Sequence, residues 1–548
     1  MKKHLYRKHL SLLSLCLFSA LINAFGQTAT VSIDATKTYQ KITGFGSHGW
    51  VDDRTLELEP AFYRIVVDRE YAGELEEAGN DNNDPNVLNE SAFTWSSESI
   101  DWAKKVYARP NPPFFIATVF SPPGWMKDMS VAPYTIYGGS EVLPTWSPCQ
   151  ENRDPKMRNL CGGKLKYEMR EEFAEWIVGW LKEWKKRTGK EIYSISIQNE
   201  PEFNEPYGSC VYTPSELAIA ADVVAKRFKK EGLKTKMFLG EILWAQSHVL
   251  NFFKEFTKYP DLMERLDAFA LHNYDTDGIQ VGGASASQWT QTYEFAARYK
   301  KEMWMSETSG HANDVTEKGL MGYCGALYNA LFYGNINLWT YITNNADDTG
   351  PLNWQAIKVT NKIKANSIRC DAISNNDLIL SLGFTNFDNQ TLSAMLINRG
   401  STEKPVKLVG ANLPAELEVY TTGFNRNAVL LGKLNKANDY TITLPGKSHS
   451  VAIGSAKITT SVSEENLAPS VSFTLSPNPA NHTVSANLSR GLNSISIYDQ
   501  LGHQVANYAL TGMESEYIFD ISNLAQGVYI VQGQSNSQKF TTRLSVVK

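Results

Sequence analysis

Two glutamates each follow a short apolar segment of the kind that forms a β-strand. Glu200 comes after Ser-Ile-Ser-Ile-Gln-Asn at 194–199, and Glu307 comes after Met-Trp-Met-Ser at 303–306. A carboxyl group at the C-terminal end of a barrel strand lies at the face that carries active sites. Solvated strand ends are the simpler interpretation for any single glutamate. The shared setting of these two favours a pair that divides proton transfer and nucleophilic attack between them.

The segments that position these glutamates alternate between strands and helices. Eight apolar or alternating runs predict strands, near 42–46, 63–68, 114–119, 192–198, 237–241, 268–273, 302–306 and 336–341. The clearest helix, at 167–187, repeats Trp176, Trp180 and Trp184 on one face, which we assign to the core. This alternation predicts an α/β fold, a (β/α)8 TIM barrel, over residues 42–370.

The barrel is flanked by segments with strand patterns only. Alternating runs separated by Gly, Asn, Pro and Lys predict an attached antiparallel β-sandwich at 371–458, which an N-terminal strand at 27–41 joins. A polar linker is expected at 459–470. The remaining residues, 471–548, predict a small C-terminal all-β domain.

The N-terminus has the composition of an export signal. Basic residues at 2–8 precede an apolar run at 10–22 and small residues at 24–26, which predicts a signal peptide over 1–26. A membrane anchor at 10–22 is the alternative, disfavoured by its short length, and no later run reaches the roughly 20 residues of a transmembrane helix. The net charge of −5 disfavours nucleic acid as a partner.

The cysteines fit an exported protein better than a metal site. No C-x-x-C spacing occurs, so we expect no zinc. Cys149 and Cys161 flank a polar loop and are the preferred disulfide pair. Cys210, Cys324 and Cys370 remain, and the sequence leaves the pairing open.

Five ordered motifs carry a resemblance to a known family. They are Gly-Phe-Gly at 44–46, Ser-Pro-Pro-Gly-Trp-Met-Lys at 121–127, Gln-Asn-Glu-Pro at 198–201, His-Asn-Tyr at 272–274 and Trp-Met-Ser-Glu at 304–307. From 28 to 455 the chain resembles glycoside hydrolase family 30. The resemblance implies retaining hydrolysis without a cofactor or metal, with Glu200 as acid/base, Glu307 as nucleophile and their carboxyl groups roughly 5–5.5 Å apart.

The same resemblance implies roles for the neighbouring residues. Asn199 would donate to the sugar 2-hydroxyl, and Arg64 would hold the nucleophile ionised. His272 and Tyr274 match the pair of the sixth strand. Trp339 would form the floor under the sugar ring, and Trp125 is a further stacking candidate. For His272 and Trp125, a packed or hydrogen-bonded core position stays open.

Two other acidic residues end predicted strands. Glu241 and Asp68 lack the Asn-Glu-Pro setting of Glu200. We expect them to support the catalytic groups or to contact the substrate.

The C-terminal domain has its own resemblance. Ser-Pro-Asn-Pro at 476–479, Ile-Tyr-Asp at 497–499, Leu-Gly at 501–502 and Gly-Val-Tyr-Ile at 527–530 are similar to the sorting domain of the type IX secretion system. This implies export to the medium or the outer cell surface, with the secretion machinery as a partner. A carbohydrate-binding module is the alternative, but residues 471–548 contain no tryptophan.

Together these features predict a secreted, monomeric, retaining endo-glycoside hydrolase without a transmembrane anchor that cleaves a β-linked plant-type polysaccharide. Xylan is favoured, without strict glucuronate dependence, because 340–354 contains no arginine or lysine to pair with that branch. The alternatives are a β-1,6-galactanase or β-1,6-glucanase, an exo-acting β-glycosidase of the same fold, and a non-catalytic surface glycan-binding protein. The sequence leaves open the sugar, its linkage, endo or exo action, and whether and where the C-terminal domain is cleaved.

Overall fold

The computed structural model describes residues 28–48, 53–67, 82, 84–89, 98–129, 160–205, 207–243, 246–274, 286–309, 317–343, 351–456, 473–488, 492–499, 503–510, 516–535 and 539–547. The chain divides into two compact units, Met1–Val462 and Ser463–Lys548. Each unit is described by itself. The predicted signal peptide, Asp68, Cys149 and the linker at 459–470 lie outside the described residues.

The first unit contains a closed barrel of eight parallel strands in the order β10-β11-β2-β3-β4-β7-β8-β9. The strands are β2 (Gly44–His48), β3 (Phe62–Val66), β4 (Phe114–Thr118), β7 (Ser194–Ser196), β8 (Lys236–Leu243), β9 (Leu266–His272), β10 (Glu302–Glu307) and β11 (Leu338–Ile342). The predicted TIM barrel is confirmed, because each of the eight expected runs overlaps one of these strands.

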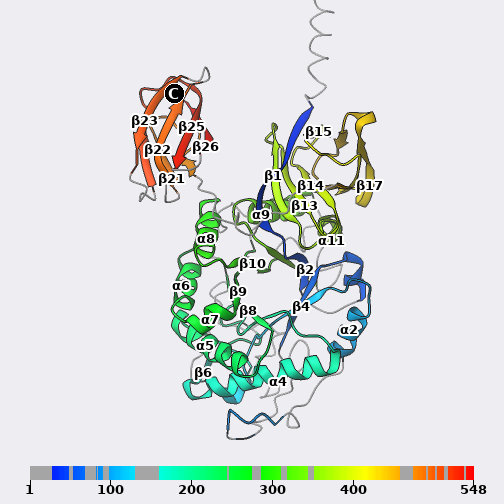
Figure 1. Cartoon of the computed structure of the whole chain (residues 1–548), viewed down its shortest axis with the longest axis vertical. Coiled ribbons are helices and arrows are strands. Elements are labelled where there is room, and N and C mark those ends of the chain that lie inside the picture. Colours follow the sequence, from blue (N-terminus) through cyan, green and yellow to red (C-terminus); the bar gives the residue numbers. More distant parts are fainter. Residues whose placement is uncertain are drawn as a thin grey trace, which may run out of the picture. The chain divides into compact units, whose positions relative to one another are not determined.

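Helices surround the barrel, as Figure 1 shows. They are α2 (Glu98–Tyr107), α4 (Arg170–Thr188), α5 (Pro214–Lys230), α6 (Gln246–Phe256), α7 (Pro260–Arg265), α8 (Ala286–Arg298), α9 (Glu317–Phe332) and α11 (Pro351–Thr360). The tryptophan stripe of α4 is buried between helix and strands, as its spacing predicts. That helix ends at Gly189, whose φ of 73° is a left-handed conformation that glycine adopts without strain.

The interior of the barrel has two layers of side chains. Towards the N-terminal ends of the strands, an apolar layer consists of Phe62, Ile116, Phe238, Ala268, Ala270, Trp304 and Leu338. Because inward-facing residues recur at every second position, the next inward residues of the same strands form a second layer. This polar layer contains Arg64, Thr118 and His272 at that spacing. Glu241 and Glu307 join it three residues after Phe238 and Trp304, because β8 and β10 are irregular there, and all five side chains are buried. The first layer is ordinary core, so the second is the place to seek chemistry.

A nine-stranded sheet completes the first unit, in the order β17-β16-β19-β14-β13-β12-β1-β15-β18. Its strands are β1 (Ala29–Lys41), β12 (Ile368–Ser374), β13 (Ile379–Asn386), β14 (Thr391–Asn398), β15 (Lys404–Gly410), β16 (Glu416–Gly423), β17 (Arg426–Asn435), β18 (Thr441–Leu444) and β19 (Ser448–Ser455). Its ladders are antiparallel except between β1 and β15, which pair in parallel. Helices α9 and α11 of the barrel pack against this sheet, so the two parts share one folded unit.

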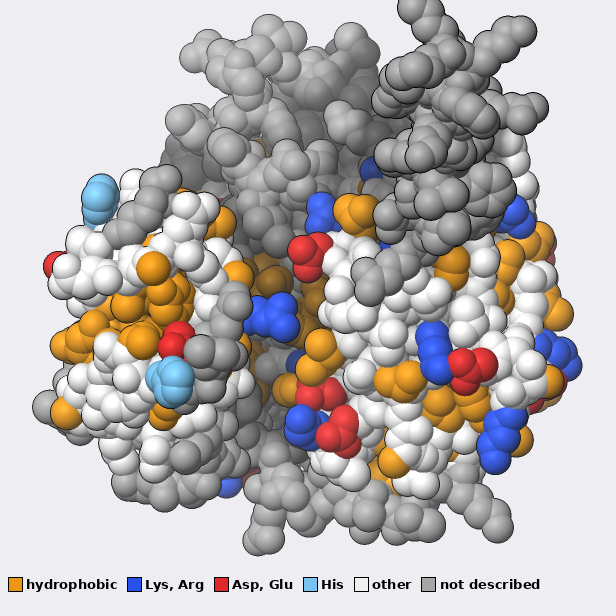
Figure 2. Space-filling view, turned by 90° about the horizontal axis from the view of Figure 1, so that it is seen from above, with side chains coloured by type: hydrophobic (Ala, Val, Ile, Leu, Met, Phe, Trp, Pro, Cys, Tyr) orange, Lys and Arg blue, Asp and Glu red, His pale blue; other side chains and the backbone are white. Residues whose placement is uncertain are grey.

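The second unit is all-β, as predicted. One sheet is β20 (Phe473–Ser476), β21 (Thr483–Leu488) and β24 (Glu516–Asp520); the other is β23 (Gln504–Ala509), β22 (Leu492–Tyr498), β25 (Gly527–Ser535) and β26 (Lys539–Val546). Its core includes Val484, Ile495, Phe519 and Val531. Hydrophobic side chains also gather on its surface, seen at the left of Figure 2, and Ile518 is 64% exposed.

Three cysteines of the described residues carry free thiols that are buried: Cys210, Cys324 and Cys370. Cys161 is disulfide-bonded, and its predicted partner Cys149 is not among the described residues. No helix in the described parts of the chain is long and apolar enough to cross a membrane.

Candidate active site

Arg64, from β3, is the centre of the polar layer. Its Nε and Nη2 atoms donate to Glu241 Oε1, at 3.1 and 2.8 Å, and Nη1 donates to Glu307 Oε2 at 2.6 Å. Nη2 also donates to Asn199 Oδ1 at 2.6 Å. The guanidinium is fully buried, and its two carboxylate partners supply the charge that such a group needs. Arg64 therefore joins three strand ends in one network.

Glu307 ends β10 and faces the interior because the strand is irregular there. The register with β9 skips between Met305 and Glu307, so that Glu307 stands opposite His272. Its Oε2 lies 3.3 Å from His48 Nε2, and its Oε1 accepts a hydrogen bond from the Tyr274 hydroxyl. Burial alone would raise the pKa of Glu307, but the charges of His272 and Arg64 hold that pKa well below its usual range. Glu307 is an ionised carboxylate.

Glu200 lies four residues beyond the end of β7, in a left-handed backbone conformation with a φ of 40°. Its backbone N–H donates to the carbonyl oxygen of Glu241 at 3.2 Å, which fixes this turn. Oε1 of its side chain lies 2.8 Å from His272 Nδ1. A carboxylate oxygen of Glu200 and one of Glu307 are within 4.8 Å of each other. The two predicted catalytic glutamates thus face one another across a short gap.

His272 lies between acidic groups on both sides. Its Nδ1 bonds Glu200, and its Nε2 is 3.5 Å from Glu241 Oε1. Burial opposes a charge here, but Glu307, Glu200 and Glu241 together raise the pKa of His272 to about 9. Side-chain ligand atoms of Glu200, His272 and Glu307 lie close enough together to suggest a metal site. With its pKa raised to about 9, His272 favours the imidazolium form, and together these groups form an ion-pair network.

Asn199 is held on both sides of its amide. Oδ1 accepts from Arg64, and Nδ2 donates to Glu205 Oε1 at 2.8 Å. An amide nitrogen has two hydrogens, so one remains for a ligand.

Glu205 and Glu202 add further carboxyl groups beside Glu200. Burial and the charge of Glu200 raise the pKa of Glu205 well above its usual range. Burial also raises the pKa of the partly buried Glu202 to about 8. Both groups therefore favour the neutral form next to the catalytic pair.

Trp339 does not take the position predicted for it. On β11, Leu338 points into the apolar layer, so the following residue points outward by strand alternation. Trp339 is 3% exposed and packs in the large cluster that contains its ladder neighbours Phe45 and Met305. The next inward position is Thr340, whose hydroxyl has no hydrogen-bond partner among the residues described. The predicted position of Trp339 is therefore wrong by one residue, since Thr340 and not Trp339 faces the interior.

Trp125 and Tyr274 lie at the mouth of the barrel. Trp125 belongs to the short helical turn η3 (Gly124–Met126) after β4 and is half-buried. The next residue but one, Lys127, is buried and donates from Nζ to Ser121 Oγ at 2.8 Å and to the carbonyl oxygens of Leu160, Gly162 and Ser209 at 2.7, 2.8 and 3.1 Å. This ammonium joins three loops at the rim and so fixes the turn that carries Trp125.

His48, Glu202 and Glu205 of the network were not singled out from the sequence. His48 accepts from Arg64 Nη1 at 2.9 Å, while its Nδ1 donates to the Arg64 carbonyl oxygen. It lies two residues after Gly46 on β2. Because side chains alternate between the two faces of a strand, this spacing could have placed His48 on the inward face from the sequence. Glu205 could have been found from the repeat of Asn-Glu-Pro at 199–201 and 204–206.

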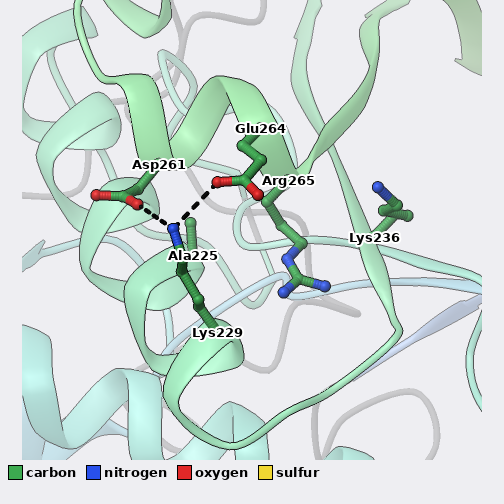
Figure 3. Close-up of a pocket in the computed structure, with 6 residues that line it drawn as sticks. All are labelled: Ala225, Lys229, Lys236, Asp261, Glu264 and Arg265. Carbon is green, nitrogen blue, oxygen red and sulfur yellow. Dashed lines mark hydrogen bonds and ion pairs between the residues drawn. The ribbon is translucent and has the colours of Figure 1, made fainter.

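A pocket shown in Figure 3 lies at the opposite end of the barrel. It is formed by α5, α7 and the start of β8, where Lys229 pairs with Asp261 and Glu264 at 3.0 and 3.1 Å. The N-terminal end of the strands supports stability rather than catalysis in barrels of this kind. The chemistry therefore belongs to the polar layer.

Solved structures with the same fold cover most of the first unit. A family 30 endoxylanase from Clostridium papyrosolvens C71 is 18% identical, with a TM-score of 0.59, covering 78% of this chain and 100% of its own. A family 30 subfamily 8 xylanase from Clostridium acetobutylicum is 17% identical, with a TM-score of 0.57, covering 78% and 99%. An endo-β-1,6-glucanase is 15% identical, with a TM-score of 0.54, covering 79% and 95%. At these identities the likeness shows the fold.

The sequence comparisons identify the C-terminal unit. A search of curated proteins gave no match. Residues 474–548 match the family described as the secretion system C-terminal sorting domain. The protein is therefore a type IX secreted or cell-surface protein whose N-terminal unit has the barrel fold of family 30 glycoside hydrolases.

Proposed function

We propose that the protein is a retaining glycoside hydrolase, with Glu307 as nucleophile and Glu200 as acid/base. The observation that carries the proposal is the gap of at most 4.8 Å between a carboxylate oxygen of Glu200 and one of Glu307. Inverting enzymes separate their carboxyl groups by roughly 6.5–9.5 Å to admit a water molecule, whereas retaining enzymes keep them roughly 5–5.5 Å apart. The short gap favours direct attack on the sugar.

In the first step, Glu307 attacks the anomeric carbon while the bond to the leaving oxygen breaks. Arg64 and Tyr274 keep the Glu307 carboxylate ionised and oriented. Glu200 gives its proton to the leaving oxygen, so no alkoxide is released. The imidazolium of His272 stabilises the Glu200 carboxylate that this transfer leaves behind.

In the second step, Glu200 takes a proton from water, and the oxygen of that water attacks the anomeric carbon. The bond from that carbon to Glu307 breaks, and the carboxylate returns to its partners in the network. Two displacements at one carbon retain its configuration. Asn199 supports both steps through its remaining N–H, which we assign to the sugar 2-hydroxyl.

For the substrate, we propose a β-linked plant-type polysaccharide cut internally, with xylan as the first choice. The structures with similar folds include xylanases and an endo-β-1,6-glucanase, which makes β-1,6-glucan the second candidate. Residues 340–354 contain no arginine or lysine for a glucuronate branch, so unbranched xylan should also be cleaved. Trp125 is the platform candidate that remains, because its half-buried ring lies on the rim.

The test is product analysis with the chain from Gln27 to Lys548. The polymers are xylan with and without glucuronate branches, β-1,6-glucan and β-1,6-galactan, and Glu307→Gln is the control. We expect a ladder of oligosaccharides from one polymer with wild type only. Monosaccharide as the sole product would indicate exo action. Binding without any product would favour a glycan-binding protein.

The Glu200→Gln variant separates the two catalytic roles. We expect loss of activity on the polysaccharide but a burst of 4-nitrophenol from an activated aryl glycoside, because that leaving group needs little acid help. Added azide should restore turnover and give the β-glycosyl azide, detected by NMR. An α-azide product, or unchanged activity in the variant, would remove Glu200 from this role.

A further inference from the structure

We propose that Glu205 is a positioning residue for this reaction: in its neutral form it fixes the Asn199 amide, so that the one free N–H of Asn199 is presented to the sugar 2-hydroxyl. The inference rests on the proposed function and adds a residue to it.

The geometry of the amide allows only one orientation. Asn199 Oδ1 accepts from Arg64 Nη2 at 2.6 Å, and Nδ2 donates to Glu205 Oε1 at 2.8 Å. A flipped amide would put two hydrogen-bond donors against each other at Arg64, so the Arg64 contact fixes which side of the amide carries the oxygen. The Arg64 contact fixes one end of the amide and Glu205 the other. Without Glu205, both hydrogens of Nδ2 would lose their fixed directions.

The surroundings of Glu205 oppose a second negative charge at this place. Glu205 is 2% exposed, and the nearby carboxylates of Glu200 and Glu307 act with burial to raise its pKa, against the hydrogen bond from Asn199. A protonated Glu205 can also donate to the Glu200 carboxylate that forms in each catalytic cycle. The charged and titratable groups of this network are Arg64, His48, Glu200, Glu202, Glu241, His272, Tyr274 and Glu307.

The first test compares substrates with and without the 2-hydroxyl. The probes are 4-nitrophenyl β-xylobioside, or the glycoside of β-1,6-linked glucose if β-1,6-glucan is the polymer cleaved, and the analogue lacking the 2-hydroxyl of the reacting sugar. For Glu205→Ala we expect kcat to fall roughly 10-fold on the hydroxylated probe with little change in KM, the size of one hydrogen bond between neutral groups. On the 2-deoxy probe the variant should match wild type.

Matched variants distinguish positioning from a general structural effect. Glu205→Gln should keep most activity, because its amide oxygen can accept from Asn199 and its NH2 can donate to Glu200. Glu302→Gln removes a partly buried carboxyl at the other end of the barrel and should leave the ratio between the two probes unchanged. An equal loss on both probes in Glu205→Ala, or a Glu205→Gln variant as poor as alanine, would overturn the proposal.

A second test needs no substrate, so it stays valid if no polysaccharide is hydrolysed and the proposed function fails. Above pH 4.3, roughly the pKa of glutamate in an unfolded chain, Glu205 is protonated in the folded protein but ionised in the unfolded one. The free energy of unfolding therefore falls as pH rises above about 4.3. Glu205→Gln should therefore equal wild type in Tm near pH 4 and exceed it by roughly 2 °C at pH 8. A Tm difference independent of pH would show that Glu205 is not neutral in the folded protein.

Discussion

The two layers inside the barrel are built on the same strands and the same inward face, yet they have opposite character. Phe62 and Arg64 are two residues apart on β3, as are Ala270 and His272 on β9. The apolar layer gains stability from burial with no electrostatic cost. The polar layer buries charges whose desolvation must be offset by partners, and its carboxylates Glu241 and Glu307 are matched by Arg64 and His272. The comparison shows that residues two or three positions apart on one strand have different roles: the first stabilises the core and the second belongs to the polar network.

Glu241 and Glu302 offer the sharpest way to test this contrast, because both are glutamates on barrel strands, the first buried and the second partly buried. Arg64 and His272 overcome burial and lower the pKa of Glu241 to about 2. Glu302 instead accepts from Trp304 Nε1 and Thr43 Oγ1, both at 2.7 Å, and burial raises its pKa. We expect Glu241→Gln to lower the free energy of unfolding at pH 7 by about 3–5 kcal/mol, since it leaves Arg64 short of a counter-charge.

Glu302→Gln is the matched control for Glu241→Gln. Its amide oxygen can accept both bonds, so the stability change should stay below about 1 kcal/mol and activity should persist. Urea unfolding of both variants provides the measurement. Equal destabilisation of the two would mean that the layers do not differ in their dependence on charge.

Phe238→Ala should lower the free energy of unfolding without lowering kcat. Phe238 is fully buried in the apolar layer and packs against Trp304 with ring centroids 5.2 Å apart. Removing the ring leaves a cavity, and we expect about 3–5 kcal/mol of destabilisation. At a temperature where the variant is folded, kcat should be close to wild type. A large fall in kcat there would show that the layers are coupled.

The charge of His272 gives a smaller effect, visible as a pH window. Its pKa in the folded protein is about 9, above the value near 6.5 of an unfolded chain. The stabilisation is therefore fully present below pH 6.5 and is lost as pH rises through about 9. At most roughly 3 kcal/mol is involved. Thermal unfolding between pH 6 and 10 should show this decline in wild type and in Phe238→Ala, and His272→Gln should lack it.

The barrel could be predicted from the sequence because each of its elements carries a local pattern. The Trp176, Trp180 and Trp184 stripe and the terminal Gly189 specify α4 almost completely. Glu200 and Glu307 could also be placed from their strand ends. Their approach to within 4.8 Å depends on the left-handed turn at Glu200 and the register skip before Glu307, and neither leaves a clear mark in the sequence.

The errors and omissions lie where the role of a residue depends on its orientation or on its contacts in three dimensions. Trp339 was assigned to the inward face, but the alternation of side chains along β11 places it on the outer face. The sequence does not fix where a strand begins, and an error of one residue in that position moves every side chain to the other face. Glu205 was missed because its importance comes from contact with Asn199, whose other partner, Arg64, lies 135 residues earlier. Networks of buried charge require the three-dimensional arrangement.

At the rim of the barrel, the ammonium group of Lys127 takes the place that a bound metal ion could otherwise have. Its ammonium lies among a hydroxyl and three carbonyl oxygens, the kind of oxygen shell that otherwise surrounds a dissolved cation. A cation tethered by its own side chain cannot diffuse away or be removed by a chelator. A protein that works outside the cell meets media of any salt content, and the arrangement of these loops is thereby made independent of that medium.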